Sequence, residues 1–188
     1  MTVTRCAWCT TDPLYQGYHD TEWGIPNKDD YKLFESLILE GFQAGLSWIT
    51  ILKKREAFRE AFDGFNPELM ARYDQKKVEE LMNNAGIIRN RSKIEASINS
   101  ARAFLELQRT GKSLTDFIWS VTEYKVLKPS QSNVSEPVTV THEATELSKK
   151  LKKAGFKFIG PVTAYAFMQA NGLTDDHEPS CFRYQKEV

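Results

Sequence analysis

The sequence predicts an all-α fold. Most of the chain divides into segments that begin at a helix-capping residue and end at a glycine, whereas few segments alternate apolar and polar residues as a half-buried strand does. The chain has 188 residues, which suffice for one hydrophobic core, and neither a repeat nor a linker divides it. We therefore expect a single domain over residues 1–188.

The first two predicted helices cover residues 29–45 and 48–62. Acidic residues open "DDYKLFESLILEGFQAG", where they complement the positive end of a helix dipole. Gly45 is expected to end this helix, and Ser47 is expected to cap "WITILKKREAFREAF". The sequence thus predicts a break in the chain at Gly45.

The later helices are predicted from the same signals. Asn66 and Pro67 open residues 66–73, and Asp74 caps a helix that stops at Gly86. The remaining expected helices are 91–111 with Ser92 as its cap, 115–124, 142–155 with Thr141 as its cap, and 161–172, which begins at Pro161 and ends at Gly172. The Pro-, Ser- and Val-rich residues 125–140 are expected to form a loop.

The charge balance excludes a strongly basic protein. Lys and Arg total 25, and Asp and Glu also total 25, so any affinity for nucleic acid has to come from local patches. The first residues lack the apolar core of a signal peptide, and residues 36–52 carry too many polar side chains to span a bilayer comfortably. We expect a cytoplasmic protein that does not interact with membranes.

Glu40 is the only ionisable residue in the most apolar stretch, "SLILEGFQAGLSWITIL". On a continuous helix the polar residues of this stretch share one narrow face: Ser36, Glu40, Gln43, Ser47 and Thr50. One interpretation is a solvated carboxylate on an amphipathic helix. The other is a carboxylate in an aromatic-lined pocket, with Trp48 as one wall, where desolvation strengthens its attraction for a cation.

Possible metal ligands lie near both ends of the chain. Zinc favours four Cys or His ligands, and two combinations are available: Cys6 and Cys9 with His177 and Cys181, or Cys6 and His19 with His177 and Cys181. Spacing alone favours the first, because Cys-x-x-Cys is a common half-site. Unligated thiols and a redox dithiol are the alternatives, although the dithiol fold needs a strand before its motif and none is evident.

A predicted helical hairpin at about 76–110 is a possible binding site for phosphate groups. Its first helix stops at Gly86, and Arg91, Ser92 and Lys93 surround the start of its second helix. Free backbone N–H groups and the helix dipole attract anions at such a position. These four residues are therefore candidate contacts to DNA phosphates, which position nucleic acid without reading its sequence. The alternative is an ordinary helical hairpin whose charged side chains are solvated.

The chain resembles the bacterial DNA-3-methyladenine glycosylase I family over nearly its whole length. The matching motifs are "DPLYQGYHDTEWGIP", "LEGFQAGLSWITILKKRE", "AGIIRNRSKI", "LSKKLKKAGFKFIGPVTAYAFMQA" and the final His177 and Cys181. The resemblance implies a helix-hairpin-helix glycosylase fold and hydrolytic excision of 3-methyladenine from alkylated double-stranded DNA. It implies a monofunctional enzyme without a lyase step, which acts as a monomer and uses no nucleotide cofactor.

The resemblance also assigns residues. It implies one structural zinc ion, held by Cys6, His19, His177 and Cys181, so that the segments 6–19 and 177–181 are joined and Cys9 is left out. The family's base pocket corresponds to Glu40, Tyr15, Tyr18 and Trp48, with Trp8 and Trp23 close by. Gly45 and Leu46 match the segment that wedges into the gap left by the flipped nucleotide, which fits the predicted break.

A protein of another class would share several of these features. A non-catalytic, zinc-stapled protein that binds damaged DNA would keep the hairpin and the basic patches. It would not need Glu40 among aromatic residues. Activity on methylated DNA separates the two possibilities.

Overall fold

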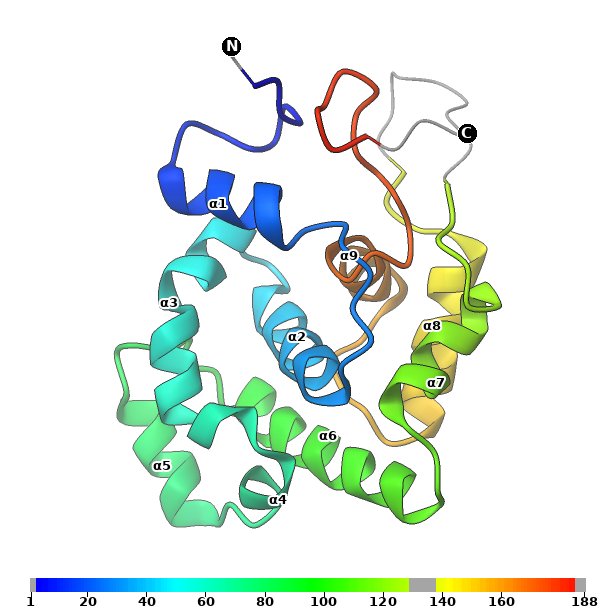
Figure 1. The fold of residues 1–188 in the computed structure, drawn as a ribbon. Helices are drawn as coiled ribbons and strands as arrows, with labels where there is room; N and C mark the ends of the chain where they lie inside the picture. Colours follow the sequence, from blue (N-terminus) through cyan, green and yellow to red (C-terminus); the bar gives the residue numbers. More distant parts are fainter. Residues whose placement is uncertain (1–2, 129–137, 185–188) are drawn as a thin grey trace.

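The computed structural model describes residues 3–128 and 138–184, and within these residues the fold is all-α (Figure 1). The helices in chain order are α1 (Pro13–Thr21), α2 (Asp30–Gln43), α3 (Trp48–Ala61), α4 (Pro67–Met70), α5 (Gln75–Asn83), α6 (Arg91–Arg109), α7 (Leu114–Trp119), α8 (His142–Lys153) and α9 (Pro161–Ala170). Two short 3₁₀ helices, η1 (Asp63–Phe65) and η2 (Ser120–Thr122), follow α3 and α7. No described helix is long and apolar enough to cross a membrane.

Helix α2 lies in the centre of the bundle, with other helices packed around it (Figure 1). Its contacts include α3, α6, α7 and α9. The helix therefore buries nearly its whole circumference, from Leu33 and Phe34 near its start to Phe42 near its end. A helical segment that is buried on all sides is a core element, so Glu40, which lies in the buried stretch from Leu37 to Phe42, faces either another element or an internal space.

Several predicted helix ends differ from the structure. Asn90, rather than Ser92, caps α6, because its side chain accepts the backbone N–H of Lys93 at 3.1 Å. Ser113 caps α7, which is shorter than the predicted 115–124 because the chain tightens into η2 after Trp119. The helix α1 was not among the predicted elements.

The predicted loop at 125–140 falls partly outside the described residues, since positions 129–137 are not described. At its start, Leu127 pairs with Thr174 in an isolated parallel bridge. The bridge lays the chain after α7 beside the chain after α9. The first and last described segments, residues 3–12 and 176–184, lie on the same side of the bundle (Figure 1).

Candidate functional site

Helix α2 ends where the sequence predicts. Its last helical residue is Gln43, and Gly45 has a φ of +83°, a left-handed conformation that glycine adopts without strain. Leu46 follows in the same turn and is 40% exposed. The polar stripe predicted on a continuous helix is therefore interrupted, and Ser47 belongs to the start of the next helix.

A pocket of about 230 Å³ opens beside the C-terminal half of α2. Six of its lining residues are those assigned to the base pocket: Trp8, Tyr15, Tyr18, Trp23, Glu40 and Trp48. The others are Gln43, Ala166, Gln169, Ala170 and Asp176. Residues from α1, α2, α3 and α9 thus meet in one cavity, a concave aromatic site of the kind that holds a small ring.

Glu40 is a buried carboxyl group in this pocket. It is 3% exposed, and its Oε2 atom has no hydrogen-bond partner among the described residues. Desolvation raises the pKa of Glu40 to about 8. The interpretation as a solvated side chain is therefore wrong, and the buried carboxyl group without a partner is a candidate binding group for a ligand in the pocket.

The aromatic residues form the walls around Glu40. The Trp8 ring lies 5.0 Å from Tyr15 and 4.9 Å from Trp23, measured between ring centroids. Across the pocket, Tyr18 and Trp48 are 5.4 Å apart, and the indole Nε1 of Trp48 is also buried without a hydrogen-bond partner among the described residues. The pocket thus offers aromatic rings and one carboxyl group to a planar ligand.

Asp176 is a second acidic residue of the pocket, and the sequence interpretation missed it. Its carboxylate accepts hydrogen bonds from Tyr165 Oη at 2.6 Å, from Thr174 Oγ1 at 2.7 Å and from the Gln169 amide. Unlike Glu40, it is fully engaged with protein donors. Its position next to His177 in the sequence could have indicated that it lies near the other site residues.

A larger cavity of about 600 Å³ lies against the first and shares the residues Tyr18, Trp48 and Ala170 with it. Its charged lining groups are mostly paired with each other. Arg55 binds Glu22 at 2.5 Å, and Arg59 binds Glu35 at 2.8 Å. The cavity therefore lacks the unpaired carboxyl group that distinguishes the Glu40 pocket.

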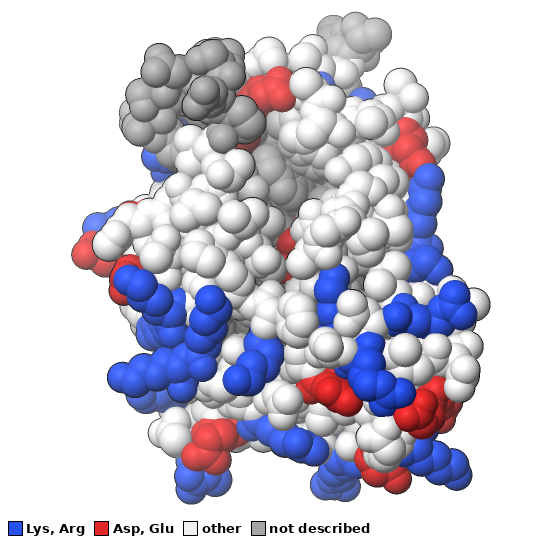
Figure 2. All heavy atoms as spheres, turned by 180° about the vertical axis from the view of Figure 1, so that it is seen from behind, with Lys and Arg blue, Asp and Glu red and all other residues white. Residues whose placement is uncertain are grey.

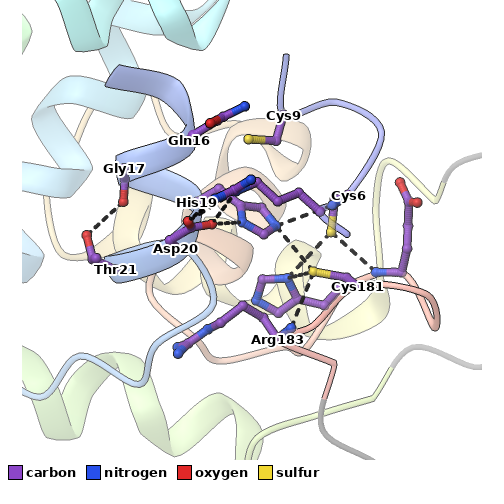
Figure 3. Close-up of polar contacts among 12 residues, drawn as sticks. Cys6, Cys9, Gln16, Gly17, His19, Asp20, Thr21, Cys181 and Arg183 are labelled. Carbon is purple, nitrogen blue, oxygen red and sulfur yellow. Dashed lines mark hydrogen bonds and ion pairs between the residues drawn. The ribbon is translucent and has the colours of Figure 1, made fainter. Parts of the chain in front are cut away.

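The four assigned metal ligands come together in the structure. The ligand atoms of Cys6, His19, His177 and Cys181 all lie within 4.8 Å of one another, and all four residues are buried. His177 Nδ1 is 3.5 Å from the sulfur of Cys6 and 3.7 Å from that of Cys181. Figure 3 shows the cluster where the two ends of the chain meet.

These distances fit a tetrahedral zinc site. Bond lengths typical of zinc give a sulfur-to-nitrogen edge of about 3.6 Å in a tetrahedron. The Cys181 sulfur lies 3.4 Å from His19 Nε2, and the other ring nitrogen of His19 is 2.9 Å from Asp20 Oδ1. A carboxylate behind a histidine in this way orients the ring toward a metal. The donor set and its geometry therefore fit a closed structural site.

Cys9 lies outside this group of four, so the structure does not bring together the combination that spacing alone favours (Figure 3). The geometry also accounts for a glycine. Gly24 has a φ of +76°, and a Cβ atom there would lie 2.7 Å from His177 Nε2. Only glycine lets the backbone come this close to the imidazole.

The hairpin residues have different environments. Gly86 lies in the loop between α5 and α6, where an added Cβ would approach Ala57 Cβ to 3.1 Å. Ser92 is exposed in the first turn of α6, and Arg91 pairs with Glu79 at 2.8 Å. The Lys93 side chain is buried, and its ammonium group donates to two backbone carbonyls. That finding removes the Lys93 ammonium from the predicted phosphate contacts.

Charge is distributed locally rather than over a whole face. Lys and Arg side chains gather in the lower half of the face shown in Figure 2, interspersed with Asp and Glu, and the upper half is largely uncharged. This arrangement agrees with the balanced composition.

Comparisons with known proteins agree with this geometry. A family model described as methyladenine glycosylase matches residues 8–184. DNA-3-methyladenine glycosylase 1 of Escherichia coli (strain K12) is 49% identical over 182 residues, covering 97% of this chain and 97% of that protein. DNA-3-methyladenine glycosylase of Haemophilus influenzae is 47% identical over 179 residues, covering 95% of this chain and 97% of that protein.

Solved structures show the same similarity. A crystal structure of 3-methyladenine DNA glycosylase I superposes with a TM-score of 0.94 at 47% identity, covering 97% of this chain and 100% of that chain. A structure of the Staphylococcus aureus 3-methyladenine DNA glycosylase I, which addresses 3-methyladenine recognition, gives a TM-score of 0.91 at 42% identity and covers 98% of each chain. The chain therefore belongs to the methyladenine glycosylase family.

Proposed function

We propose that this protein is a monofunctional DNA glycosylase that excises 3-methyladenine from alkylated double-stranded DNA in base excision repair. The relatives named above are 3-methyladenine DNA glycosylases at 42–49% identity. The observation that carries the proposal for this chain is Glu40, a buried carboxyl group without a hydrogen-bond partner among the described residues, in an aromatic pocket.

The pocket suits the chemistry of the lesion. Methylation at N3 gives adenine in DNA a positive charge, which aromatic faces and a carboxylate both attract. A cation next to Glu40 favours the ionised carboxyl group, so the lesion and the Glu40 charge stabilise each other. Neutral adenine gains neither interaction, and Glu40 therefore selects the methylated base.

Hydrolysis follows from this binding. The bond between the sugar C1′ and the base nitrogen breaks, its electron pair neutralises the base, and water adds to C1′ with loss of a proton. The leaving group is neutral and needs little general-acid help, so flipping, stacking and electrostatic stabilisation by Glu40 supply the catalysis. A base flipped out of the duplex is required for access to the pocket.

We further propose that the remaining assigned residues hold the DNA and the fold. Leu46, on the exposed turn at Gly45, fills the gap left by the flipped nucleotide. The hairpin of α5 and α6 acts as a helix-hairpin-helix motif, and Gly86, Arg91 and Ser92 contact phosphates. Cys6, His19, His177 and Cys181 hold a structural zinc ion, since four protein ligands leave no position for substrate. Residues 1–188 act as one monomeric domain.

Release of the free base tests the function. Purified protein is incubated with methylated duplex DNA, and the released bases are separated by chromatography. We expect free 3-methyladenine with little 7-methylguanine. A folded, metal-loaded protein that binds the DNA and releases no base would instead be the non-catalytic damage-binding protein.

A further inference from the structure

Lys93 connects the start of α6 to the end of α2. Its Nζ donates to Phe42 O at 2.9 Å and to Ala44 O at 2.7 Å, and the residue is 9% exposed. Carbonyls at the end of a helix lack intrahelical partners and carry the negative end of the helix dipole, so an ammonium group binds them well. The two bonds fix the backbone immediately before Gly45 and Leu46.

Lys54 makes the converse connection. It lies on α3, the helix that follows the Gly45–Leu46 turn, and its Nζ donates to Ala85 O at 3.0 Å and to Gly86 O at 3.2 Å. These carbonyls belong to the loop between α5 and α6. The same loop packs closely on α3, since a Cβ atom added at Gly86 would lie 3.1 Å from Ala57 Cβ.

We propose that Lys54 and Lys93 form a reciprocal clasp that positions the wedge turn, residues 44–47, relative to the hairpin loop, residues 84–90. Lys93, on α6, binds backbone carbonyls at the start of the wedge turn. Lys54, on α3, binds backbone carbonyls of the hairpin loop. The inference rests on the proposed function, in which the turn enters the duplex and the hairpin holds the phosphates. Both lysines are thus positioning residues. They couple how far Leu46 enters the duplex to how the hairpin binds the phosphates.

The turn needs such a restraint. A Cβ atom added at Gly45 would meet no atom within 4 Å, and the Leu46 side chain is exposed. A glycine turn with an exposed apolar residue is not fixed by its own packing. Misplacement of a group by about 1 Å can lower a rate by about 100-fold, so a fixed wedge has a direct effect on base flipping.

Four variants test the clasp: Lys93→Met, Lys54→Met, the double variant, and Lys76→Met as a matched control. Lys76 is an exposed hairpin lysine, so its replacement removes one positive charge from the same region. Amide hydrogen exchange of residues 42–48 is measured in the free protein. Three further quantities are measured for the same variants: the rate of excision from methylated duplex DNA, the affinity for free 3-methyladenine, and the salt dependence of binding to undamaged duplex.

We expect Lys93→Met to exchange faster in the wedge turn and to excise about tenfold more slowly, a loss typical of removing a charged hydrogen bond. Free 3-methyladenine binds as to the wild type, because the pocket is intact. The fold-decrease in excision rate of the double variant is smaller than the product of the fold-decreases of the two single variants, because both lysines restrain the same contact between the turn and the loop. Lys76→Met leaves exchange in the turn unchanged.

Three results would overturn the clasp. The first is unchanged exchange in the turn of Lys93→Met. The second is a fall of about one in the salt dependence of duplex binding for Lys93→Met, which would mark a direct phosphate contact. The third is a double variant whose fold-decrease in excision rate equals the product of the fold-decreases of the two single variants. Failure of the wild type to release base would contradict the proposed function. Amide hydrogen exchange requires no catalysis, so it would still test the clasp in that case.

Discussion

The ring of Trp23 packs edge-on against the ring of His177, with centroids 4.6 Å apart and an interplanar angle of 88°. Trp23 lines the Glu40 pocket, and His177 belongs to the Cys/His cluster. On the same side, Trp8 lies 5.2 Å from His19. His177 and His19 of the cluster therefore pack against two aromatic walls of the pocket. These two contacts link the Cys/His cluster to the shape of the pocket.

Loss of the proposed zinc ion is expected to weaken both the fold and the pocket. Cys181→Ser removes one thiolate, and we predict a lower melting temperature, lower zinc content and weaker binding of free 3-methyladenine, because His177 no longer holds Trp23. Cys9→Ser is the matched control and should change none of these. The measurements are zinc analysis, thermal unfolding and tryptophan fluorescence titration. Equal zinc content in both variants would contradict the ligand assignment.

The stability of the protein is expected to depend on Glu40 in a pH-dependent way. Because folding raises the pKa of Glu40 from 4.5 to about 8, the unfolded chain binds fewer protons between these values, and stability falls as the pH rises through this window. Glu40→Gln removes this loss. We predict that the variant melts at about the wild-type temperature near pH 4 and at a higher temperature above pH 8. A constant difference at all pH values would contradict the buried, desolvated environment.

The wedge is expected to matter only in duplex DNA. Leu46→Ala removes the side chain that fills the gap, so excision from methylated duplex should fall about tenfold or more, while binding of free 3-methyladenine should stay unchanged. Val162→Ala is a control, since Val162 is an exposed apolar residue elsewhere on the surface. The idea fails if Leu46→Ala and Val162→Ala excise equally fast.

The hairpin contact is expected to be electrostatic. Arg91→Gln should weaken binding to damaged and undamaged duplex alike, and the salt dependence of binding should fall by about one. Binding measured at several salt concentrations gives both quantities. Selective loss for damaged DNA alone would show that Arg91 acts in recognition of the lesion instead.

Much of the fold could be predicted because its signals are local. Asp74 and Thr141 cap helices as expected, and Gly45 ends α2 by adopting a left-handed conformation. Helix α1 carries local signals of the same kind, Asp12 as its cap and Pro13 in its first turn, although it is not among the predicted helices. Helix boundaries such as that at Asn90 depend on which of several capping residues forms the bond.

The site could be predicted only in part, because burial and partners depend on tertiary structure. Periodicity left the environment of Glu40 open, and the structure resolves it by surrounding α2 with other helices. Lys93 looks like a phosphate contact in sequence, and only its burial shows that it binds carbonyls. The place of Asp176 in the pocket comes from the packing of distant elements, and its only signal in the sequence is its position next to His177.

The central claim is that the buried Glu40 carboxyl group recognises the charge of the lesion. The most direct test is the single-turnover rate of 3-methyladenine release by Glu40→Gln and by the wild type, with binding to undamaged duplex measured on the same samples. We predict a folded variant with unchanged affinity for undamaged duplex and a release rate lower by about 100-fold, the scale of a lost preorganised electrostatic interaction. Release at the wild-type rate would contradict the claim.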